Sequence, residues 1–387
     1  MTVQNHSQNM RTQALVVEKA GSPFVLQEIL LDEVRNDEVL VEMKYSGLCH
    51  TDIVAQHGLM PVGGFPAVLG HEGAGVIRMV GKSVKNKSLE KGKLVLLSFN
   101  SCQKCSSCVS GLPGNCPSST EINFAGTRKS DGSHPAKLLD GTGARGQFFG
   151  QSSFSKLAVV HENSVVPCDV SEESLAMMAP LGCGYQTGAG TVLNVLKPTP
   201  TTRLAVFGMG AVGCAALLAA KSLGVTHIIA VDILPGKLEF ARSLGATETI
   251  NTGDVDDICA AFAAIGGVEH IIETTGISKL IAQGIKALSH AGKMALVGVP
   301  RPDMPIDIDP LNFLMSTKTL VGVIEGQCNP PETLPQLIQL YQQGHFPIDK
   351  LGKVYDVQNI EQALEDLKAG TVIKPILSWN SISDTQQ

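Results

Sequence analysis

The sequence has few aromatic residues, little charge and no signature of a membrane or nucleic-acid partner. Aromatic residues make up 4% of its 387 residues and charged ones 17%. A net charge of −6 without any basic run argues against nucleic acid as the main partner. No apolar run approaches the roughly 18 residues of a membrane span, so we expect none. The N-terminal "MTVQNHSQNMRTQ" lacks the apolar stretch of a secretory signal, and we therefore expect a cytoplasmic protein.

The length and the cysteine content set the next limits. A chain of 387 residues with 43% hydrophobic residues is too long for one ordinary core, which predicts two domains. Ten cysteines would indicate a disulfide framework only in a small secreted protein. In a large chain without a signal sequence, clustered cysteines more often bind metal.

Four of the ten cysteines stand in the stretch "CQKCSSCVSGLPGNC". Cys102, Cys105, Cys108 and Cys116 follow a C-x2-C-x2-C-x7-C pattern. Four thiolates around one zinc make a closed tetrahedral site, which is structural because no position is left for substrate. An iron–sulfur cluster is the main alternative, since the first three spacings are shared with ferredoxins, and disulfides are the other. The pattern favours structural zinc.

A second set of metal-type residues is scattered over "GLCHTD", "GHEGAG" and "LGCGYQTG". Cys49, His71 and Cys183 would form a Cys2His site with one open position for water or an alcohol oxygen, which is the catalytic arrangement. Glu72 is an alternative ligand or a neighbour that orients one. Thr51 offers a hydroxyl that would pass on a proton, or it simply caps a helix that begins in "TDIVAQHG". Taken singly, each of these residues is more often structural, because a lone buried Cys is usually a small core residue.

The second half of the chain carries a nucleotide-binding pattern. In "TRLAVFGMGAVGCAALLAAKSLG", Gly208, Gly210 and Gly213 form G-x-G-x-x-G between a predicted strand and a predicted helix. The glycines allow a tight turn and close approach to a pyrophosphate. The backbone amides of Ala211 and Val212 at the helix N-terminus favour that anion.

The residues after this turn indicate which dinucleotide binds. Asp232 ends the next predicted strand, "HIIAVD", 19 residues after Gly213. A carboxylate there accepts hydrogen bonds from ribose hydroxyls and repels a 2′-phosphate, which favours NAD over NADP. Lys237, near the start of the following helix, is either a ribose contact or a solvated lysine.

Strands and helices then alternate, which predicts an α/β fold with a doubly wound, six-stranded parallel sheet. The first 185 residues instead show short alternating runs, at 39–47, 74–81 and 93–99, and predict a mostly β domain. We expect the last segment, with helices over 331–344 and 359–370 and a strand over 372–379, to pack back on that domain. In the alternating part we expect strands at 202–207, 227–232, 248–250, 270–276, 293–299 and 319–326, with helices after the glycine turn and at 234–246, 255–265 and 278–290.

These motifs, in this order, resemble the zinc-dependent medium-chain alcohol dehydrogenases over about residues 11 to 380. The resemblance implies a GroES-like catalytic domain (1–185 and 326–387) with a structural zinc lobe at 100–118. It implies a Rossmann NAD-binding domain at 186–325, and two zinc ions per chain. Within the family, "FFGQSSF", "NFAGTRKSDGS" and "IIETTG" resemble the aryl-alcohol (benzyl alcohol) branch. That likeness implies oxidation of primary aromatic or allylic alcohols, or reduction of the matching aldehydes.

The resemblance also assigns roles residue by residue. Cys49, His71 and Cys183 match the catalytic zinc ligands, Glu72 the acidic neighbour, and Thr51 the proton-relay hydroxyl. His50 and Lys374 match residues that contact the pyrophosphate, and Thr187 and Val297 match residues that flank the nicotinamide. Phe148, Phe149 and Val299 match the walls of the substrate pocket, although the alternative for these three apolar residues is that they are ordinary core residues.

One position departs from the liver-type pattern. Those members end the proton relay with a His five positions after the first Cys, where this chain has Val54. The proton would then leave through water, the ribose hydroxyl or His50. Two other functions remain open: a glutathione-dependent formaldehyde-type or aliphatic alcohol dehydrogenase, and a non-catalytic nucleotide-binding relative. The long segment between Cys116 and Phe148 is similar to that of dimeric members, so we expect a homodimer, with a tetramer as the alternative.

Overall fold

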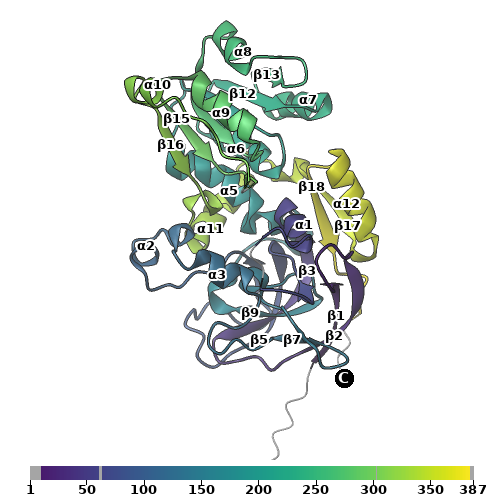
Figure 1. Cartoon of the computed structure of the whole chain (residues 1–387). Helices are drawn as coiled ribbons and strands as arrows, with labels where there is room; N and C mark the ends of the chain where they lie inside the picture. The colour runs from purple at the N-terminus through teal and green to yellow at the C-terminus, as the bar shows by residue number, and fades with distance from the viewer. Residues whose placement is uncertain (1–9, 61–62, 302, 384–387) are drawn as a thin grey trace, which may run out of the picture.

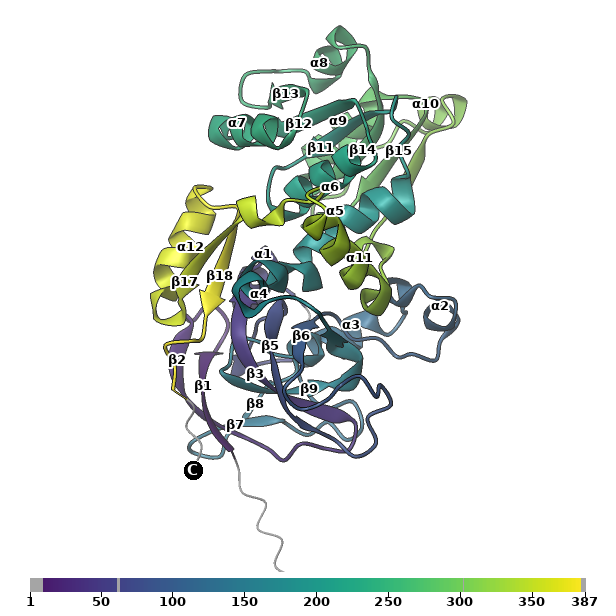
Figure 2. The same ribbon diagram turned by 180° about the vertical axis from the view of Figure 1, so that it is seen from behind.

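The computed structural model describes residues 10–60, 63–301 and 303–383. Figure 1 shows two lobes, one built around β-sheets and one around a sheet flanked by helices. The C-terminal elements α12 (Ile360–Ala369) and β18 (Lys374–Ser378) lie beside the N-terminal strands rather than with the helix-flanked sheet (Figures 1 and 2). Among the residues described, no helix combines the length and the apolar character that crossing a membrane requires.

The helix-flanked lobe contains a six-stranded sheet in the order β13-β12-β11-β14-β15-β16. All neighbouring strands run parallel, which confirms the predicted doubly wound sheet. The strand order reverses at β11, and ligands of such sheets bind at this switch point. The elements are β11 (Arg203–Phe207), α6 (Ala211–Ser222), β12 (His227–Asp232), α7 (Pro235–Leu244), β13 (Glu248–Asn251), α8 (Ile258–Ala264), β14 (Val268–Glu273), α9 (Ser278–Ala287), β15 (Leu288–Leu296), α10 (Pro310–Met315) and β16 (Thr319–Gly322).

Apolar side chains on both faces explain why this sheet is covered twice. Leu204 and Val206 of β11 join one core cluster with α6, whereas Ala205 and Phe207 join another with α8 and α9. Successive residues of a strand point to opposite faces, so a continuous apolar run needs helices on both. The predicted helix 278–290 is too long: α9 ends at Ala287, because Leu288 already pairs with Val268 of β14.

The β-rich lobe holds two sheets, in the orders β4-β1-β2-β7-β8 and β10-β6-β5-β3-β18-β17, with β9 also pairing β3. Strand β18 (Lys374–Ser378) runs antiparallel to β3 (Glu38–Gly47), so the C-terminal segment packs back as predicted. The other strands are β1 (Met10–Val17), β2 (Val25–Leu31), β4 (Ala67–Val68), β5 (Gly73–Val80), β6 (Leu94–Leu97), β7 (Ala136–Leu138), β8 (Gly143–Ala144), β9 (Leu157–His161), β10 (Val165–Pro167) and β17 (Gly352–Asp356).

Short helices connect these strands and carry most of the candidate site. Helix α1 (His50–Gln56) follows β3, and α5 (Gly184–Gly190) leads from the β-rich lobe into the other one. The remaining helices are α2 (Ser106–Val109), α3 (Ser119–Phe124), α4 (Glu172–Met178), α11 (Pro330–Gln342) and α12 (Ile360–Ala369).

Candidate active site

Four metal-type side chains from distant parts of the sequence meet between the two lobes. Cys49 precedes α1, His71 and Glu72 precede β5, and Cys183 precedes α5. One ligand atom from each lies within 4.8 Å of the others. The three segments that the sequence could not place together therefore converge.

His71 is oriented by a residue that the sequence analysis missed. Asp52 is fully buried, and its Oδ1 lies 2.9 Å from His71 Nδ1. The same carboxylate accepts hydrogen bonds from the backbone N–H groups of Gly70 and Cys49, both at 3.0 Å. With Nδ1 engaged, the Nε2 atom of His71 is buried and has no hydrogen-bond partner among the described residues. An imidazole held in this way presents a lone pair to a metal, so the donor set fits zinc.

The electrostatics of the cluster also favour a cation. The hydrogen bond with Cys183 lowers the pKa of the Cys49 thiol well below its usual range against the effect of burial, and Lys374 and His71 lower it further. The same hydrogen bond and burial raise the pKa of Cys183. Burial would lower the pKa of His71, but Asp52 and Cys49 raise it well above its ordinary value. A thiolate beside two further donors is the state that binds zinc.

Glu72 is held by a buried lysine. Both of its carboxylate oxygens lie within 3.0 Å of Lys374 Nζ, and Oε1 also accepts a hydrogen bond from Gly184 N at 3.0 Å. Lys374 is 2% exposed and additionally donates to the carbonyl of Leu48. Burial raises the pKa of Glu72 to about 7, although Lys374 opposes the shift. Glu72 therefore fixes the residue next to Cys183. Lys374, the predicted pyrophosphate contact, has its ammonium group directed at this carboxylate, and its nucleotide role stays a prediction.

Two aromatic rings pack against the imidazole of His71. The ring of Phe149 stacks on His71 at a centroid distance of 4.6 Å, and Phe148 meets it edge-on at 5.6 Å. Phe124 packs against both phenylalanines. Phe148 and Phe149 are only 1% and 7% exposed, so they are core residues as well as neighbours of the metal cluster. Gln151 of the same segment donates to the carbonyl of His71 at 2.9 Å and holds its backbone.

The predicted proton-relay residues lie on the first turn of α1. Cys49, not Thr51, is the N-cap residue, and Asp52 completes a capping box with it. Thr51 is half-buried, His50 is exposed and Val54 is half-buried. The structure places Thr51 two residues from a metal-type thiol, and its role in proton transfer stays a prediction.

A third buried carboxylate lies next to Cys183. Glu325, in the short 3-10 helix η6 (Glu325–Gln327), has its Oε1 3.5 Å from Cys183 Sγ. Its Oε2 accepts hydrogen bonds from Gln186 Nε2 at 3.1 Å and Thr187 Oγ1 at 3.3 Å. Burial raises the pKa of Glu325 to about 7, although His71 and Gln186 oppose the shift. The sequence analysis placed Glu325 inside the predicted strand 319–326, whereas β16 ends at Gly322 and Glu325 begins the turn after it. A lone acidic residue at the end of this predicted strand was the available signal, because such sheets bind ligands at that edge.

The four cysteines of the lobe also come together. Ligand atoms of Cys102, Cys105, Cys108 and Cys116 lie within 4.8 Å of one another. The backbone N–H groups of Cys105 and Cys108 point at the sulfurs of Cys102 and Cys105, at 3.3 and 3.5 Å. N–H groups directed at sulfur stabilise thiolates, so this arrangement fits a closed metal site.

The predicted phosphate-binding turn has the expected geometry. Gly208 has a φ of +87°, and a Cβ on Gly213 would lie 1.9 Å from the carbonyl oxygen of Gly208. Nothing lies within 4 Å of a Cβ built on Gly210, so the backbone is open there to a ligand. Ala211 and Val212 begin α6 and are half-buried. The cradle fits a pyrophosphate in contact with the helix N-terminus.

Asp232 stands at the end of β12, next to this turn. Its Oδ2 accepts a hydrogen bond from Met209 N at 2.7 Å, and Oδ1 accepts from the N–H groups of Ile233 and Leu234. These bonds fix the carboxylate beside the glycine turn. Thr187 is buried, Val297 is half-buried, and Val299 is 65% exposed on the loop after β15. The roles of these three residues at the cofactor and substrate stay predictions.

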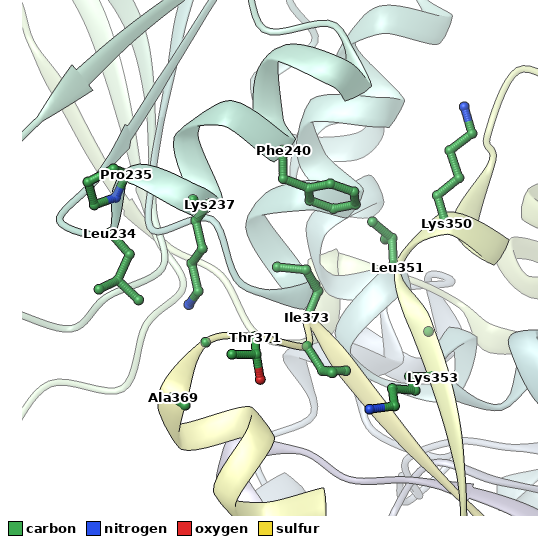
Figure 3. A pocket seen from close by; sticks show the side chains of 14 residues that line it. Leu234, Pro235, Lys237, Phe240, Lys350, Leu351, Lys353, Ala369, Thr371 and Ile373 are labelled. Atoms are coloured by element: carbon green, nitrogen blue, oxygen red, sulfur yellow. The ribbon is translucent and has the colours of Figure 1, made fainter.

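A cavity of about 670 Å³ lies between α7, the residues around Lys350 and the link from α12 to β18. Figure 3 shows Lys237 reaching from α7 toward Ala369 and Thr371, with Phe240 and Ile373 deeper in the wall. Lys237 is half-buried and lines this cavity, and its contact with the ribose stays a prediction.

Known proteins resemble both lobes. The family model described as "Alcohol dehydrogenase GroES-like domain" matches residues 35–170, and the one described as "Zinc-binding dehydrogenase" matches residues 211–343. A geraniol dehydrogenase of Castellaniella defragrans is 37% identical, over 94% of this chain and 97% of its own. Among solved structures, benzyl alcohol dehydrogenase of Acinetobacter calcoaceticus is 40% identical with a TM-score of 0.89, over 95% of this chain and 99% of its own. An alcohol dehydrogenase zinc-binding domain protein of Burkholderia ambifaria has a TM-score of 0.90 at 40% identity, over 96% and 99% of the two chains.

Proposed function

Because this chain belongs to the zinc-dependent medium-chain alcohol dehydrogenase family, we propose that it interconverts primary aromatic or allylic alcohols and their aldehydes, with NAD as the redox partner. The observation that carries the proposal is the setting of His71. Its buried Nε2 has no hydrogen-bond partner among the described residues, and ligand atoms of Cys49 and Cys183 lie within 4.8 Å of the histidine. The rings of Phe148 and Phe149 pack against its imidazole. The relatives named geraniol dehydrogenase and benzyl alcohol dehydrogenase support the substrate class.

Separate groups of side chains would bind the metals and transfer the proton. Cys49, His71 and Cys183 would hold the catalytic zinc, and the four-cysteine lobe would hold a second, structural one. When bound, the zinc would polarise the alcohol oxygen and the NAD would accept the hydride. Thr51 would take the hydroxyl proton and pass it toward His50 or water, since Val54 offers no imidazole.

A matched substrate panel tests this function. Benzyl alcohol is compared with cyclohexylmethanol, and geraniol with citronellol, which lacks the allylic double bond, each with NAD and with NADP. We expect at least tenfold higher kcat/KM for the conjugated member of each pair, because its aldehyde product is conjugated. Equal rates within the pairs, or activity confined to the glutathione adduct of formaldehyde, would contradict the substrate assignment and leave the family membership standing.

The cofactor preference is proposed to depend on Asp232. Its carboxylate would accept the ribose hydroxyls and repel a 2′-phosphate. We expect kcat/KM with NAD to exceed that with NADP at least tenfold, and Asp232→Ser to narrow the ratio. An unchanged ratio in this variant would assign the preference to other residues.

We also propose a homodimer joined along the edge of the parallel sheet. Strand β16 is the last strand of that sheet. The neighbouring α10 exposes Leu311, Leu314 and Met315 by 69%, 71% and 69%. Apolar side chains gathered beside a strand edge are typical of a covered surface. Light scattering should give twice the mass of the 40.8 kDa chain, and Leu314→Glu should reduce it to one chain.

A further inference from the structure

The carboxylate of Glu325 joins three groups of the proposed catalytic site. It lies 3.5 Å from the sulfur of Cys183, a proposed zinc ligand. It accepts the hydroxyl hydrogen of Thr187, the predicted flank of the nicotinamide, at 3.3 Å. It also accepts from Gln186, whose amide donates to the carbonyl of Gly182 at 2.7 Å and so fixes the residue before Cys183. The buried Glu325 side chain therefore contacts both Cys183, a proposed zinc ligand, and Thr187, a predicted neighbour of the nicotinamide.

The backbone that carries Glu325 has an uncommon conformation. Glu325, Gly326 and Gln327 have successive φ values of +49°, +63° and +51°. Residues with a Cβ rarely adopt this region, and such strain persists where the surroundings enforce it. The turn is enforced by α5, because a Cβ on Gly326 would lie 2.6 Å from the carbonyl oxygen of Gln186. Asn194 also donates to the carbonyl of Gly326 at 3.1 Å.

The four-cysteine lobe supports the same turn from the other side. Gly114, between Cys108 and Cys116 of the lobe, packs on the turn so closely that a Cβ there would lie 3.0 Å from the carbonyl oxygen of Ile324. The turn is thus held between α5 and the lobe, and Glu325 points from it into the site.

We propose that Glu325 is a positioning residue, which fixes Thr187 and the Cys183 segment relative to each other and so aligns the nicotinamide with the metal-bound end of the site. The inference rests on the proposed function. Glu325 touches neither the substrate nor the cofactor in this account. It acts through Thr187 and through the first turn of α5.

Three variants separate this role from simple packing. Glu325→Ala removes all three contacts. Glu325→Gln keeps one side-chain oxygen that accepts from Thr187 but replaces the second oxygen with a donor. Ile324→Ala is the matched control, because Ile324 precedes Glu325 on the same turn and is 59% exposed.

The measurements are zinc per chain, NADH affinity by fluorescence, kcat and KM for NAD, and the kinetic isotope effect with an α-deuterated alcohol. For Glu325→Ala we expect unchanged zinc content, a KM for NAD raised at least fivefold, NADH affinity lowered at least threefold, kcat lowered at least tenfold, and a larger isotope effect. For Glu325→Gln, we expect KM for NAD, NADH affinity, kcat and the isotope effect to lie between those of Glu325→Ala and the wild type. Ile324→Ala should stay within twofold of the wild type in every quantity.

A lower melting temperature with unchanged kcat, KM, NADH affinity and isotope effect would overturn the inference, since packing alone produces that result. If Glu325→Ala does not fold, Glu325→Gln decides by the same criteria, with at least a threefold loss of kcat required. The proposed function fails separately, if the wild type oxidises no alcohol. NADH affinity in the variants still tests Glu325 in that case: unchanged affinity would overturn the positioning role, and a threefold loss would support it.

Discussion

Removal of the Asp52 carboxylate should loosen the catalytic metal without touching the four-cysteine lobe. Asp52 holds His71 Nδ1 at 2.9 Å and accepts from two backbone N–H groups. Carboxylates that orient a metal-binding histidine contribute about 10–100-fold in metal affinity, which corresponds to roughly 1.4–2.7 kcal/mol. Asp52→Ala also leaves two backbone donors unpaired in a buried place, at about 1–3 kcal/mol each. Asp52→Asn keeps one acceptor oxygen and should lose metal affinity with a smaller loss of stability.

Zinc retention against a graded chelator measures this directly. The lobe serves as an internal reference, because its four cysteines do not depend on Asp52. In Asp52→Ala and Asp52→Asn, we expect the affinity for the more weakly held zinc to be about 10–100-fold lower than in the wild type. The affinity for the zinc of the four-cysteine lobe should not change. Asp257→Asn is the matched control: its carboxylate also accepts a backbone N–H at the start of a helix, at 2.8 Å, far from any proposed ligand.

If Asp52→Ala folds and retains both zinc ions as tightly as the wild type, the carboxylate does not orient His71 for metal binding. The pairing between Asp52 and His71 would then be structural only. A loss of zinc in Asp257→Asn as well would show that the chelator reports general stability instead.

Three further outcomes are expected. Cys49→Ser should abolish turnover and lower zinc from two to one per chain by elemental analysis; two remaining zinc ions would contradict its role as a ligand. Lys374→Met should leave the Glu72 carboxylate buried without its partner and lower the free energy of unfolding by about 3–5 kcal/mol in urea titrations, whereas a change below 1 kcal/mol would show that the pair contributes little. Burial raises the pKa of Glu42, but Lys44 and Lys156 lower it to about 2 from its ordinary 4.5. Because this folded-state pKa is depressed, the stability that Glu42 provides is present above pH 4.5 and is lost as the pH falls toward 2, and Glu42→Gln should flatten urea midpoints over that range.

The nucleotide-binding half was predictable because its signals are local. The strand before Gly208, the helix after it and the aspartate at the end of the next strand all follow from neighbouring residues, and the sheet has the predicted six parallel strands. Where local signals are ambiguous, the prediction failed at a boundary. Residues 288–290 continue a helical pattern, yet Leu288 pairs with Val268 because the sheet competes for the same backbone groups.

The candidate metal centre was predictable only in part. Cysteines and a histidine are recognisable as donors, but what each donor touches depends on contacts between distant segments. Asp52 is separated from His71 by 19 residues, Glu72 from Lys374 by 302, and Cys183 from Glu325 by 142. No periodicity links such pairs, so the sequence assigned Lys374 to the nucleotide by resemblance and did not single out Asp52 or Glu325 at all.

The charges around the proposed catalytic centre favour a bound cation. Asp52, Glu72 and Glu325 are buried carboxylates at most 9% exposed, and the Cys49 thiol has a pKa well below its usual range. Among the described residues, Lys374 is the one buried lysine that forms a hydrogen bond with any of these three carboxylates. Buried anionic groups without compensation are costly, and they lower that cost by taking up protons or by binding a cation. Burial raises the pKa of both Glu72 and Glu325 to about 7, so these carboxyl groups hold protons more readily than ordinary ones. On the proposed function, a divalent ion bound at this cluster would compete with those protons, and its binding would release them.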